Sequence, residues 1–368
     1  MARSKAFIAE DFFPPRAIPY DSNLRDLFAV EIAEDELAEK LLEFIPHLNH
    51  DTLVELSLYL ALESKFNNKE VWRAIEAASL EALHLLTLKQ VCQLEWATTQ
   101  LKPKRTNGRF NTMLMQRAYN EVDRCSALEL SYLMQGFRQK ANKGLTEKVR
   151  KNLIERRTGL FPNGVETEDG REMLANTLFT FASCRPKNWG VYQQYANDEV
   201  EELIANYEHD LCEAAENASP EQLTQLAQAL YILKTSDFEN IFWRVERRTN
   251  QLAHEGQLDA YHATNILRAL SRSQKNKMCG QDKTFTVLEP TILATIDSIP
   301  DRDLTHLMYA YSVRGVGNPE LHAAFERRLD EMADRLDYPS LFNAIYYMLF
   351  RENANEGIWR KLVENTCA

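Results

Sequence analysis

Apolar residues recur along most of the chain as a spaced triplet, at positions i, i+3 and i+6. Eight copies occur, at Leu53/Leu56/Tyr59, Val91/Leu94/Ala97, Leu130/Leu133/Gly136, Ala175/Leu178/Phe181, Leu223/Leu226/Ala229, Ala263/Ile266/Ala269, Leu304/Leu307/Ala310 and Leu341/Ala344/Tyr347. The steps between their first members are 38, 39, 45, 48, 40, 41 and 37 residues. Steps of three residues keep side chains on one broad face of a helix. The pattern therefore predicts a helix at each triplet and a repeat of about forty residues.

Each repeat is predicted to hold two helices. The clearest copies are residues 219–252 and 300–332, which both open with Pro and an acidic residue and reach Glu-Arg-Arg 80 to 81 residues apart. Ser219, and the segment from Asp337 to Ser340, are predicted to cap the helices that follow them. The third triplet member is often Ala or Gly, which lets a neighbouring helix approach closely. Because one helix pair cannot bury its apolar face alone, the fold class predicted is all-α: an α-solenoid of about eight helix-turn-helix repeats of roughly 37–48 residues.

The spacing also predicts how the chain is divided. We expect an extended N-terminal arm plus a capping helix in 1–49, basic repeats 1–3 in 50–157, a loop-rich junction with the start of repeat 4 in 158–190, and acidic repeats 4–8 in 191–368. Long loops are predicted at Thr158–Asp169, Arg185–Gly190 and Gln274–Thr284. The arm, residues 6–20, is rich in aromatic residues and proline, so it is predicted to lie extended in a groove of this chain or of a partner. Its candidate anchors are Phe7, Phe12, Phe13 and Tyr20.

Composition supports long helices with short connections. Gly and Pro number only 12 each among 368 residues, below the average usage of about 7% and 5%. The six cysteines form no CxxC pair, which favours a reducing compartment over disulfides. We find no apolar run long enough for a signal peptide or a transmembrane segment. The aromatic residues Trp96, Phe325 and Trp359 fall on apolar stripes and are interpreted as core.

Charge is segregated along the chain, whose net charge is −11. Residues 102–157 hold fourteen basic and five acidic residues, a net charge of +9, so the rest carries −20. The candidate basic patch comprises Lys102, Lys104, Arg105, Arg109, Arg138, Lys140, Lys143, Lys148, Arg150, Lys151, Arg156 and Arg157. The candidate acidic docking face comprises Asp198, Glu199, Glu201, Glu202, Glu208, Asp210, Glu213 and Glu216. The basic patch suits RNA phosphates, an anionic lipid surface or an acidic protein, and the alternative is ordinary solvation with pairing inside the chain.

Candidate chemistry is sparse. There is no GxSxG, GxxxxGK[ST], GxGxxG or HExxH motif. His47 and His50, and His209 beside Asp210 and Cys212, match no known metal-ligand set. We therefore expect no enzyme activity, no catalytic residues, no metal and no cofactor.

The C-terminal repeats resemble a known family. Residues 300–332, PDRDLTHLMYAYSVRGVGNPELHAAFERRLDEM, followed by DYPSLFNAIYYMLF, are similar to the heptatricopeptide-type helical repeats of organellar proteins. Such repeats occur in FAST-kinase-like and RAP-domain proteins and are similar to octotricopeptide repeats. The resemblance covers roughly residues 50–365, is strongest in the last third, and includes no RAP domain. It implies a mitochondrial or plastid protein, tied to organellar RNA or to a large organellar assembly.

Two functions remain open from the sequence. The first is a structural or assembly subunit of a large mitochondrial complex (ribosome, ATP synthase or respiratory assembly), with other protein subunits as partners. The second is an organellar RNA-binding protein acting in RNA processing or translation. Reading RNA repeat by repeat requires polar residues at equivalent positions of every repeat. The residue after the second triplet member shows no such pattern (Ser57, Glu95, Met134, Phe179, Ala227, Leu267, Met308, Ile345), which favours the scaffold.

Overall fold

All regular elements in the described part of the chain are helices. The computed structural model describes residues 21–29, 32–62, 66, 68–100, 108–137, 143–161, 164–183, 193–233, 239–272, 282–351 and 355–367. The predicted all-α class is confirmed for these residues.

Every predicted triplet lies within a helix. These triplet helices are α3 (His50–Leu62), α5 (Leu88–Thr99), α7 (Ala127–Gly136), α10 (Glu168–Ser183), α12 (Pro220–Leu233), α14 (Ala260–Arg272), α16 (Asp301–Arg314) and α18 (Tyr338–Leu349). The helices that follow them, the partner helices, are α4 (Lys69–Glu81), α6 (Gly108–Glu121), α8 (Lys143–Glu155), α11 (Gln193–Asn217), α13 (Glu239–His254), α15 (Asp282–Thr295), α17 (Pro319–Met332) and α19 (Glu356–Cys367). The remaining helices are α1 (Ser22–Ala29), α2 (Glu34–Phe44), α9 (Arg157–Leu160) and the 3₁₀ turns η2 (Ile45–His47) and η3 (Val122–Arg124).

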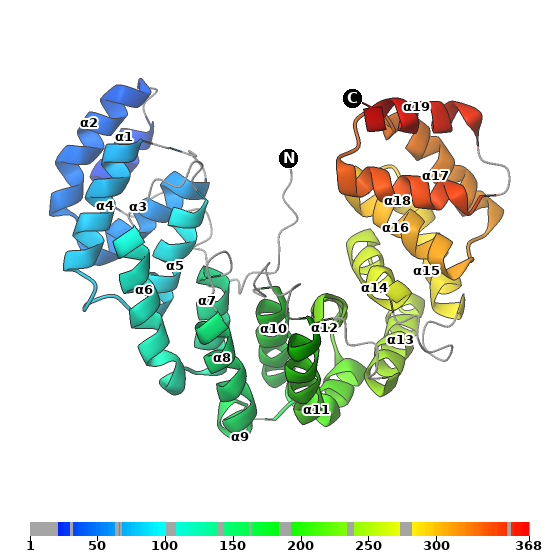
Figure 1. The fold of residues 1–368 in the computed structure, drawn as a ribbon, viewed down its shortest axis with the longest axis horizontal. Helices are drawn as coiled ribbons and strands as arrows, with labels where there is room; N and C mark the ends of the chain where they lie inside the picture. Colours follow the sequence, from blue (N-terminus) through cyan, green and yellow to red (C-terminus); the bar gives the residue numbers. More distant parts are fainter. Residues whose placement is uncertain are drawn as a thin grey trace. The chain divides into compact units, whose positions relative to one another are not determined.

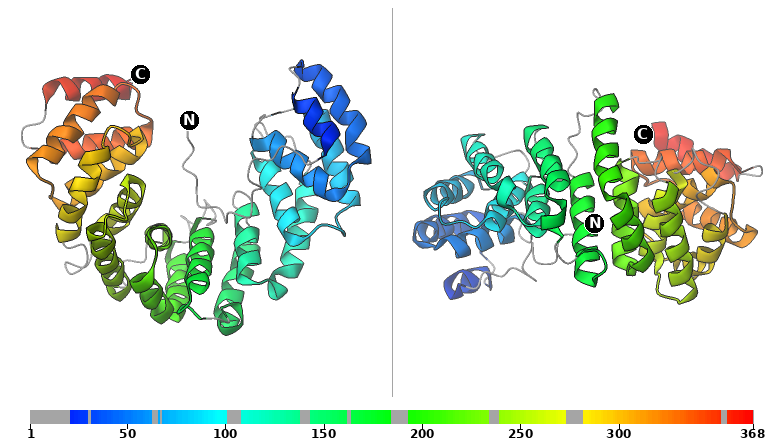
Figure 2. Two further views of the ribbon diagram at one scale, coloured as in Figure 1. Left: turned by 180° about the vertical axis from the view of Figure 1, so that it is seen from behind. Right: turned by 90° about the horizontal axis from the view of Figure 1, so that it is seen from below.

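Helices of one kind pack against the next of the same kind. Contacts join α3 to α5 and α5 to α7, and in the C-terminal part α12 to α14, α14 to α16 and α16 to α18. The partner helices do the same, from α4 to α6 and from α13 through α15 and α17 to α19. Figures 1 and 2 show the C-terminal helices side by side in this order. The core therefore lies between two rows of helices, and each contact spans a short stretch of sequence.

The small third triplet member has the predicted effect at Gly136. A Cβ atom on this residue would lie 2.4 Å from the carbonyl oxygen and 2.6 Å from the Cα of Cys92. Such distances are shorter than real Cβ contacts allow, and the obstacle is helix backbone. Glycine is therefore required where α7 crosses α5.

Both predicted helix caps are present. Ser219 Oγ accepts the backbone N–H of Gln222, and the Gln222 side chain accepts the N–H of Ser219 in return. Asp337 accepts the N–H of Ser340 at 3.0 Å at the start of α18. Each cap satisfies a backbone donor that the first helical turn leaves open.

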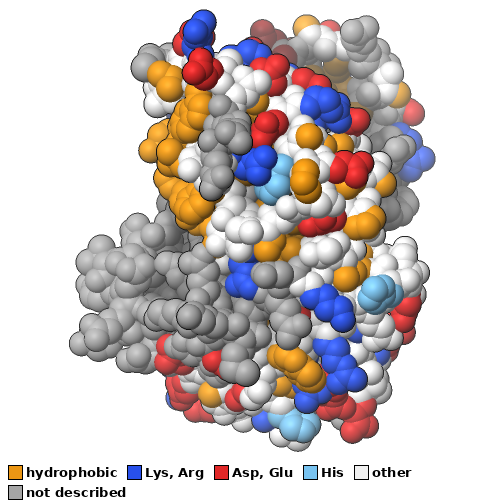
Figure 3. All heavy atoms as spheres, turned by 90° about the vertical axis from the view of Figure 1, so that its right-hand side faces the viewer, with side chains coloured by type: hydrophobic (Ala, Val, Ile, Leu, Met, Phe, Trp, Pro, Cys, Tyr) orange, Lys and Arg blue, Asp and Glu red, His pale blue; other side chains and the backbone are white. Residues whose placement is uncertain are grey.

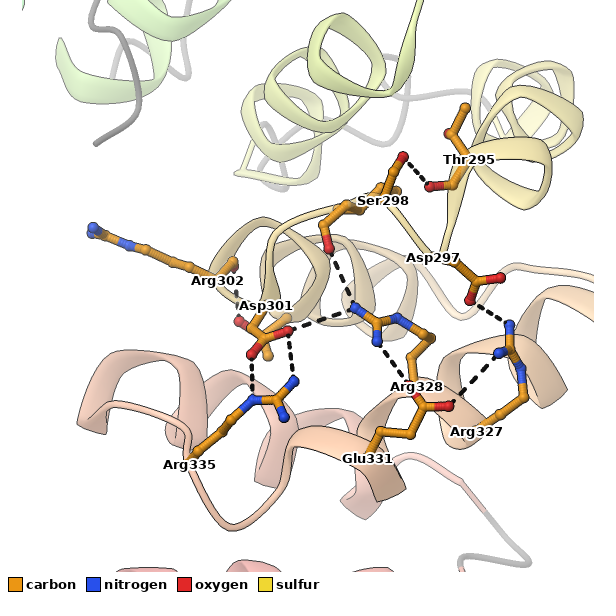
Figure 4. Close-up of polar contacts among 11 residues, drawn as sticks. Thr295, Asp297, Ser298, Asp301, Arg302, Arg327, Arg328, Glu331 and Arg335 are labelled. Carbon is orange, nitrogen blue, oxygen red and sulfur yellow. Dashed lines mark hydrogen bonds and ion pairs between the residues drawn. The ribbon is translucent and has the colours of Figure 1, made fainter. Parts of the chain in front are cut away.

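The Glu-Arg-Arg segments have a structural role that the pattern did not predict. The second arginine of each segment reaches the loop that precedes the triplet helix: Arg248 Nε donates to the Ala218 carbonyl at 2.9 Å, and an Arg328 guanidinium nitrogen lies 3.5 Å from the Ile299 carbonyl. Arg156 approaches the Val122 carbonyl in the same way, at 3.4 Å. Figure 4 shows Asp301, at the start of α16, between the guanidinium groups of Arg328 and Arg335. These side chains fix the connection between consecutive helix pairs.

The chain divides into two compact units. The first contains residues 1–162 and 176–196, and the second contains residues 163–175 and 197–368. The division falls in part inside α10, whose first half belongs to the second unit and whose second half belongs to the first.

The predicted long loops are partly helical. Residues 158–160 of the segment Thr158–Asp169 belong to α9, and residues 168 and 169 begin α10. Gly164 takes a positive φ of 63° in the turn between them, where Val165 is buried. Residues 282–284 of the segment Gln274–Thr284 form the first turn of α15. Arg185–Gly190 and the arm lie outside the described residues.

Candidate interaction surfaces

A strip of half-exposed aromatic and polar side chains runs along the triplet helices of the second unit. We call it the polar–aromatic strip, and its members are Tyr231, Arg268, His306, Tyr309, Asn343 and Tyr346. Four of them occupy one register: His306 and Asn343 lie two residues after the first triplet member, and Tyr309 and Tyr346 lie five residues after it. Since the triplet faces the core, these positions lie on the opposite side of the helix.

Contacts between successive helices hold the strip in place. The Arg268 guanidinium lies over the Tyr231 ring at 4.6 Å, which links α14 to α12. The Asn343 amide nitrogen and His306 Nδ1 are 2.9 Å apart, and the Tyr309 and Tyr346 ring centroids are 4.8 Å apart, which links α18 to α16. The side chains are therefore ordered before any partner arrives.

A second surface is the outer side of α18. Tyr338, Phe342, Tyr346 and Phe350 follow one another at intervals of four residues, and we call them the α18 stripe. Tyr338 is 80% exposed, Phe342 58% and Phe350 56%, and the neighbouring Leu349 is 66% exposed. Ring contacts join Phe342 to Tyr346 and Tyr346 to Phe350, at centroid distances of 6.5 and 4.7 Å. The signal was in the sequence as a four-residue aromatic period, but that period is also typical of a core face.

The predicted basic patch is engaged in local pairs wherever its side chains are described. Lys148 Nζ lies 2.8 Å from the Asp123 carboxylate and 4.4 Å from the centre of the Tyr119 ring. This lysine lowers the pKa of Asp123, and the amide of Asn152 adds a second hydrogen bond to the same carboxylate. Because Lys148 is on α8 and Asp123 on η3, the pair joins two helical elements and does not present a free cation.

Other members of the basic patch behave alike. Arg150 makes two hydrogen bonds with Glu147, Lys151 lies 3.7 Å from Glu155, and Arg156 contacts the Val122 carbonyl and Asn152. Arg109 is exposed on α6 and Arg157 is half-buried in α9. Lys102, Lys104, Arg105, Arg138 and Lys140 lie outside the described residues, as does the side chain of Lys143. The described side chains thus favour pairing inside the chain over a continuous phosphate-binding surface.

The predicted acidic face lies on α11 and is partly covered by α13. Glu216 forms ion pairs with Arg244 and Arg247, and these two arginines flank the exposed ring of Trp243 at 5.0 and 5.6 Å. Glu208 accepts a hydrogen bond from Asn240, also on α13. Asp210 and Glu213 lie 3.9 Å from the exposed His209, and Glu201 and Glu202 are exposed. The side chains of Asp198 and Glu199 lie outside the described part, as do Phe7, Phe12, Phe13 and Tyr20 of the arm.

The titratable groups do not assemble into a reactive centre. Burial raises the pKa of the Cys125 thiol to about 12 and raises that of Cys92 as well, which disfavours the nucleophilic thiolate. Burial also lowers the pKa of His322, whose ring nitrogens lie 3.2 Å from the Tyr347 hydroxyl and the Val316 carbonyl. Among the described residues, no three His, Cys, Asp or Glu side chains are grouped so as to hold a metal ion. Nor does any helix in the described ranges have the length and apolar character needed to cross a membrane.

Comparison with known proteins adds no relative. No protein-family model matches the chain. No curated protein matches it either. The resemblance of residues 300–350 to organellar helical repeats stays a prediction from the sequence.

Proposed function

We propose that this chain is a non-catalytic helical scaffold, an α-solenoid of about eight two-helix repeats, that serves as a structural or assembly subunit of a large mitochondrial complex. Its partners are other protein subunits, bound along the triplet helices. The polar–aromatic strip is the observation that carries the proposal.

The solenoid part of the proposal is supported by the register of the contacts. Triplet helices contact triplet helices, partner helices contact partner helices, and Arg156, Arg248 and Arg328 approach equivalent loops. A fold in which each unit is stabilised by its sequence neighbours is the definition of a repeat protein.

The composition of the strip is that of a protein interface. Tyrosine and arginine are enriched at interfaces because they offer a large contact area together with polar groups. The contacts of Arg268 with Tyr231, and of Tyr309 with Tyr346, fix these side chains in advance, so that less side-chain entropy is lost on binding.

RNA binding is the second candidate, and the strip favours it more than the basic patch does. Aromatic rings and arginine planes also stack on unpaired bases. A phosphate backbone needs a row of free cations as well. Lys148, Arg150 and Arg156 are each hydrogen-bonded inside the chain, which supports a protein partner.

The mitochondrial location rests on the resemblance of the C-terminal repeats alone. That segment is similar to heptatricopeptide-type repeats, which occur in organellar proteins. A tagged full-length chain imaged in cells tests this part, and a signal outside mitochondria would refute it without touching the scaffold.

The scaffold is tested with the same tagged chain in a density gradient of the cell or organelle lysate. We expect the chain to sediment with a megadalton complex, and Arg268→Glu or Tyr309→Ala to move it to the free fraction. The exposed Arg360 on α19 provides the matched control, since Arg360→Glu changes charge away from the strip.

The competing RNA function is tested by the affinity of the purified chain for pooled organellar RNA at several salt concentrations. Tight binding with a steep salt dependence, abolished by charge reversal at Arg150, Lys151, Arg156 and Arg157, would replace the scaffold proposal. Weak binding that ignores these reversals supports it.

A further inference from the structure

The α18 stripe occupies a face that other triplet helices bury. The residue directly after the first triplet member faces the next triplet helix: Cys92 of α5 lies against Gly136 of α7, and Ser131 of α7 lies 3.1 Å from Thr177 of α10. The equivalent residues of α12, α14 and α16 are Thr224, Thr264 and Thr305, all of them buried. On α18 the equivalent residue is Phe342, which is 58% exposed.

Two further positions repeat this difference. Four residues after the first triplet member, Ala227, Leu267 and Met308 are buried, whereas Ile345 is half-exposed. Eight residues after it, Ser271 and Ser312 are buried, whereas Leu349 is 66% exposed. The exposed face of α18 is thus equivalent to a contact face, and within the described residues no further helix covers it. Figure 3 shows hydrophobic side chains gathered at the upper left of the surface that includes the C-terminal helices.

The side chains on this face differ from those that a following repeat would contact. Thr224, Thr264 and Thr305 are compact, and each hydroxyl is satisfied by a carbonyl of its own helix at 2.7 to 2.9 Å. Compact residues permit the close helix approach seen where Gly136 meets Cys92. Phe342 holds a neighbouring helix farther away, which suits a face that meets other aromatic rings.

We propose that this face binds a second copy of the same chain, with the two α18 helices antiparallel across a two-fold axis near Ala344. In that arrangement Tyr338 lies opposite Phe350 of the other copy, and Phe342 lies opposite Tyr346. A two-fold interface requires such self-complementarity.

Charges at the two ends of the stripe agree with this pairing. Asp337 directly precedes Tyr338 and is ionised at neutral pH, because hydrogen bonds from Ser340 lower its pKa. Arg351 directly follows Phe350 and lies near Glu326 at 3.2 Å. The antiparallel pairing brings Asp337 of each copy towards Arg351 of the other, whereas a parallel pairing would bring like charges together.

The stripe offers less surface than the roughly 800 Å² per partner of a standard stable interface. We therefore expect a reversible dimer with a Kd on the order of 10 µM. The dimer is independent of the scaffold function, which uses the strip along α12 to α16.

Sedimentation velocity of the full chain from about 1 to 200 µM tests the proposal. We expect a monomer–dimer equilibrium, and an increase in Kd of at least about tenfold for Phe342→Glu and for Leu349→Glu. Val363→Glu is the matched control, because Val363 is 54% exposed on α19, away from the stripe. Circular dichroism melting establishes that each variant folds, and Tyr338→Glu replaces any variant that does not.

A monomer throughout the range would overturn the proposal, as would a dimer that both glutamate variants leave unchanged. Orientation is tested by mixing Tyr338→Cys with Phe350→Cys chains under mild oxidation, with the unmodified chain giving the background from native cysteines. The antiparallel pairing predicts more disulfide-linked dimer in the mixture than in either variant alone. Cross-linking of Tyr338→Cys chains to one another would instead show a parallel pairing.

Discussion

At the scale of single residues, the closest helix packing in the chain depends on Gly136. Replacing Gly136 with Val should destabilise the first unit by about 2–3 kcal/mol or more, since overpacking a tight site costs about 1–3 kcal/mol and the obstacle here is the backbone of Cys92. The better helix propensity of a non-glycine residue, worth at most about 1 kcal/mol, does not offset this. Chemical denaturation followed by circular dichroism measures the change.

Gly108 provides the control for Gly136. It begins α6, and an added Cβ would meet nothing within 4 Å. Gly108→Ala should therefore leave the free energy of unfolding within about 1 kcal/mol of the original chain. Equal losses for the two variants would show that the tight contact with Cys92 is not what limits position 136.

A second residue-scale prediction concerns pH. Burial and the nearby Arg351 lower the pKa of His322, against the opposing effects of the Val316 carbonyl and Glu326. The folded chain therefore keeps His322 neutral, while the unfolded chain takes up a proton below about pH 6.5. The contribution of His322 to stability is complete above that pH and is lost as the pH falls through the unfolded pKa towards the folded one.

The test for His322 is the melting temperature at pH 7.5 and 5.5. The original chain should lose more stability on acidification than His322→Gln, whose amide still hydrogen-bonds but does not titrate. His209→Gln, at an exposed site on α11, should behave like the original chain. An identical pH response in the His322 variant would remove this histidine as the cause.

At the scale of the helical elements, consecutive arginines in α13 and α17 have different roles. Arg328 is 11% exposed and contacts Asp301, Glu331 and the Ile299 carbonyl, whereas the side chain of Arg327 is 51% exposed and pairs with Asp297. Arg328→Met should cost about 1–3 kcal/mol, because it leaves partly buried acceptors unpaired. Arg327→Met should cost less than about 1 kcal/mol, as exposed ion pairs do.

The same pair of variants in α13 tests whether the device recurs. Arg248→Met removes the hydrogen bond to the Ala218 carbonyl, and Arg247→Met removes an exposed pair with Glu216. Urea unfolding should rank both second arginines above both first arginines. The opposite ranking in either helix would mean that the loop contact contributes little.

Much of the helical order was predictable from the sequence, because the triplets record burial directly. All eight triplets lie in helices, and Ser219 and Asp337 cap the helices as predicted. The loop predictions were less accurate because Gly and Pro mark turns without fixing their length: α9 and the start of α10 occupy part of Thr158–Asp169.

The surfaces were harder to predict, since a sequence pattern does not show which neighbour covers a face. Lys148 and Asp123 are 25 residues apart and meet only because α8 packs against η3. Phe342 follows an apolar period that predicts burial, yet it is exposed because no described helix follows on that side of α18. Exposure and pairing depend on tertiary contacts, which one-dimensional periodicity does not contain.

At the scale of the whole molecule, the separation of charge along the sequence does not persist as two free surfaces. In the first unit Lys148 and Arg150 pair with acidic residues at most 25 residues away, and in the second unit Glu216 pairs with arginines of the next helix along the chain. The net charge of each region is therefore locally balanced in part. Binding at the polar–aromatic strip should depend less on salt than the sequence charges alone suggest.

Stability should be local in the same sense, because helix contacts join elements one or two places apart in the chain. In such a fold a substitution destabilises its own unit and its neighbours, and the effect fades with distance along the array. We predict that Gly136→Val speeds amide hydrogen exchange in α5 and α7 and leaves α14, α16 and α18 unchanged, and that Arg328→Met does the reverse. Exchange followed by mass spectrometry on the full chain measures both variants. Faster exchange along the whole chain in either variant would show that the two units unfold as one cooperative structure, and the repeat description would then fail for its energetics.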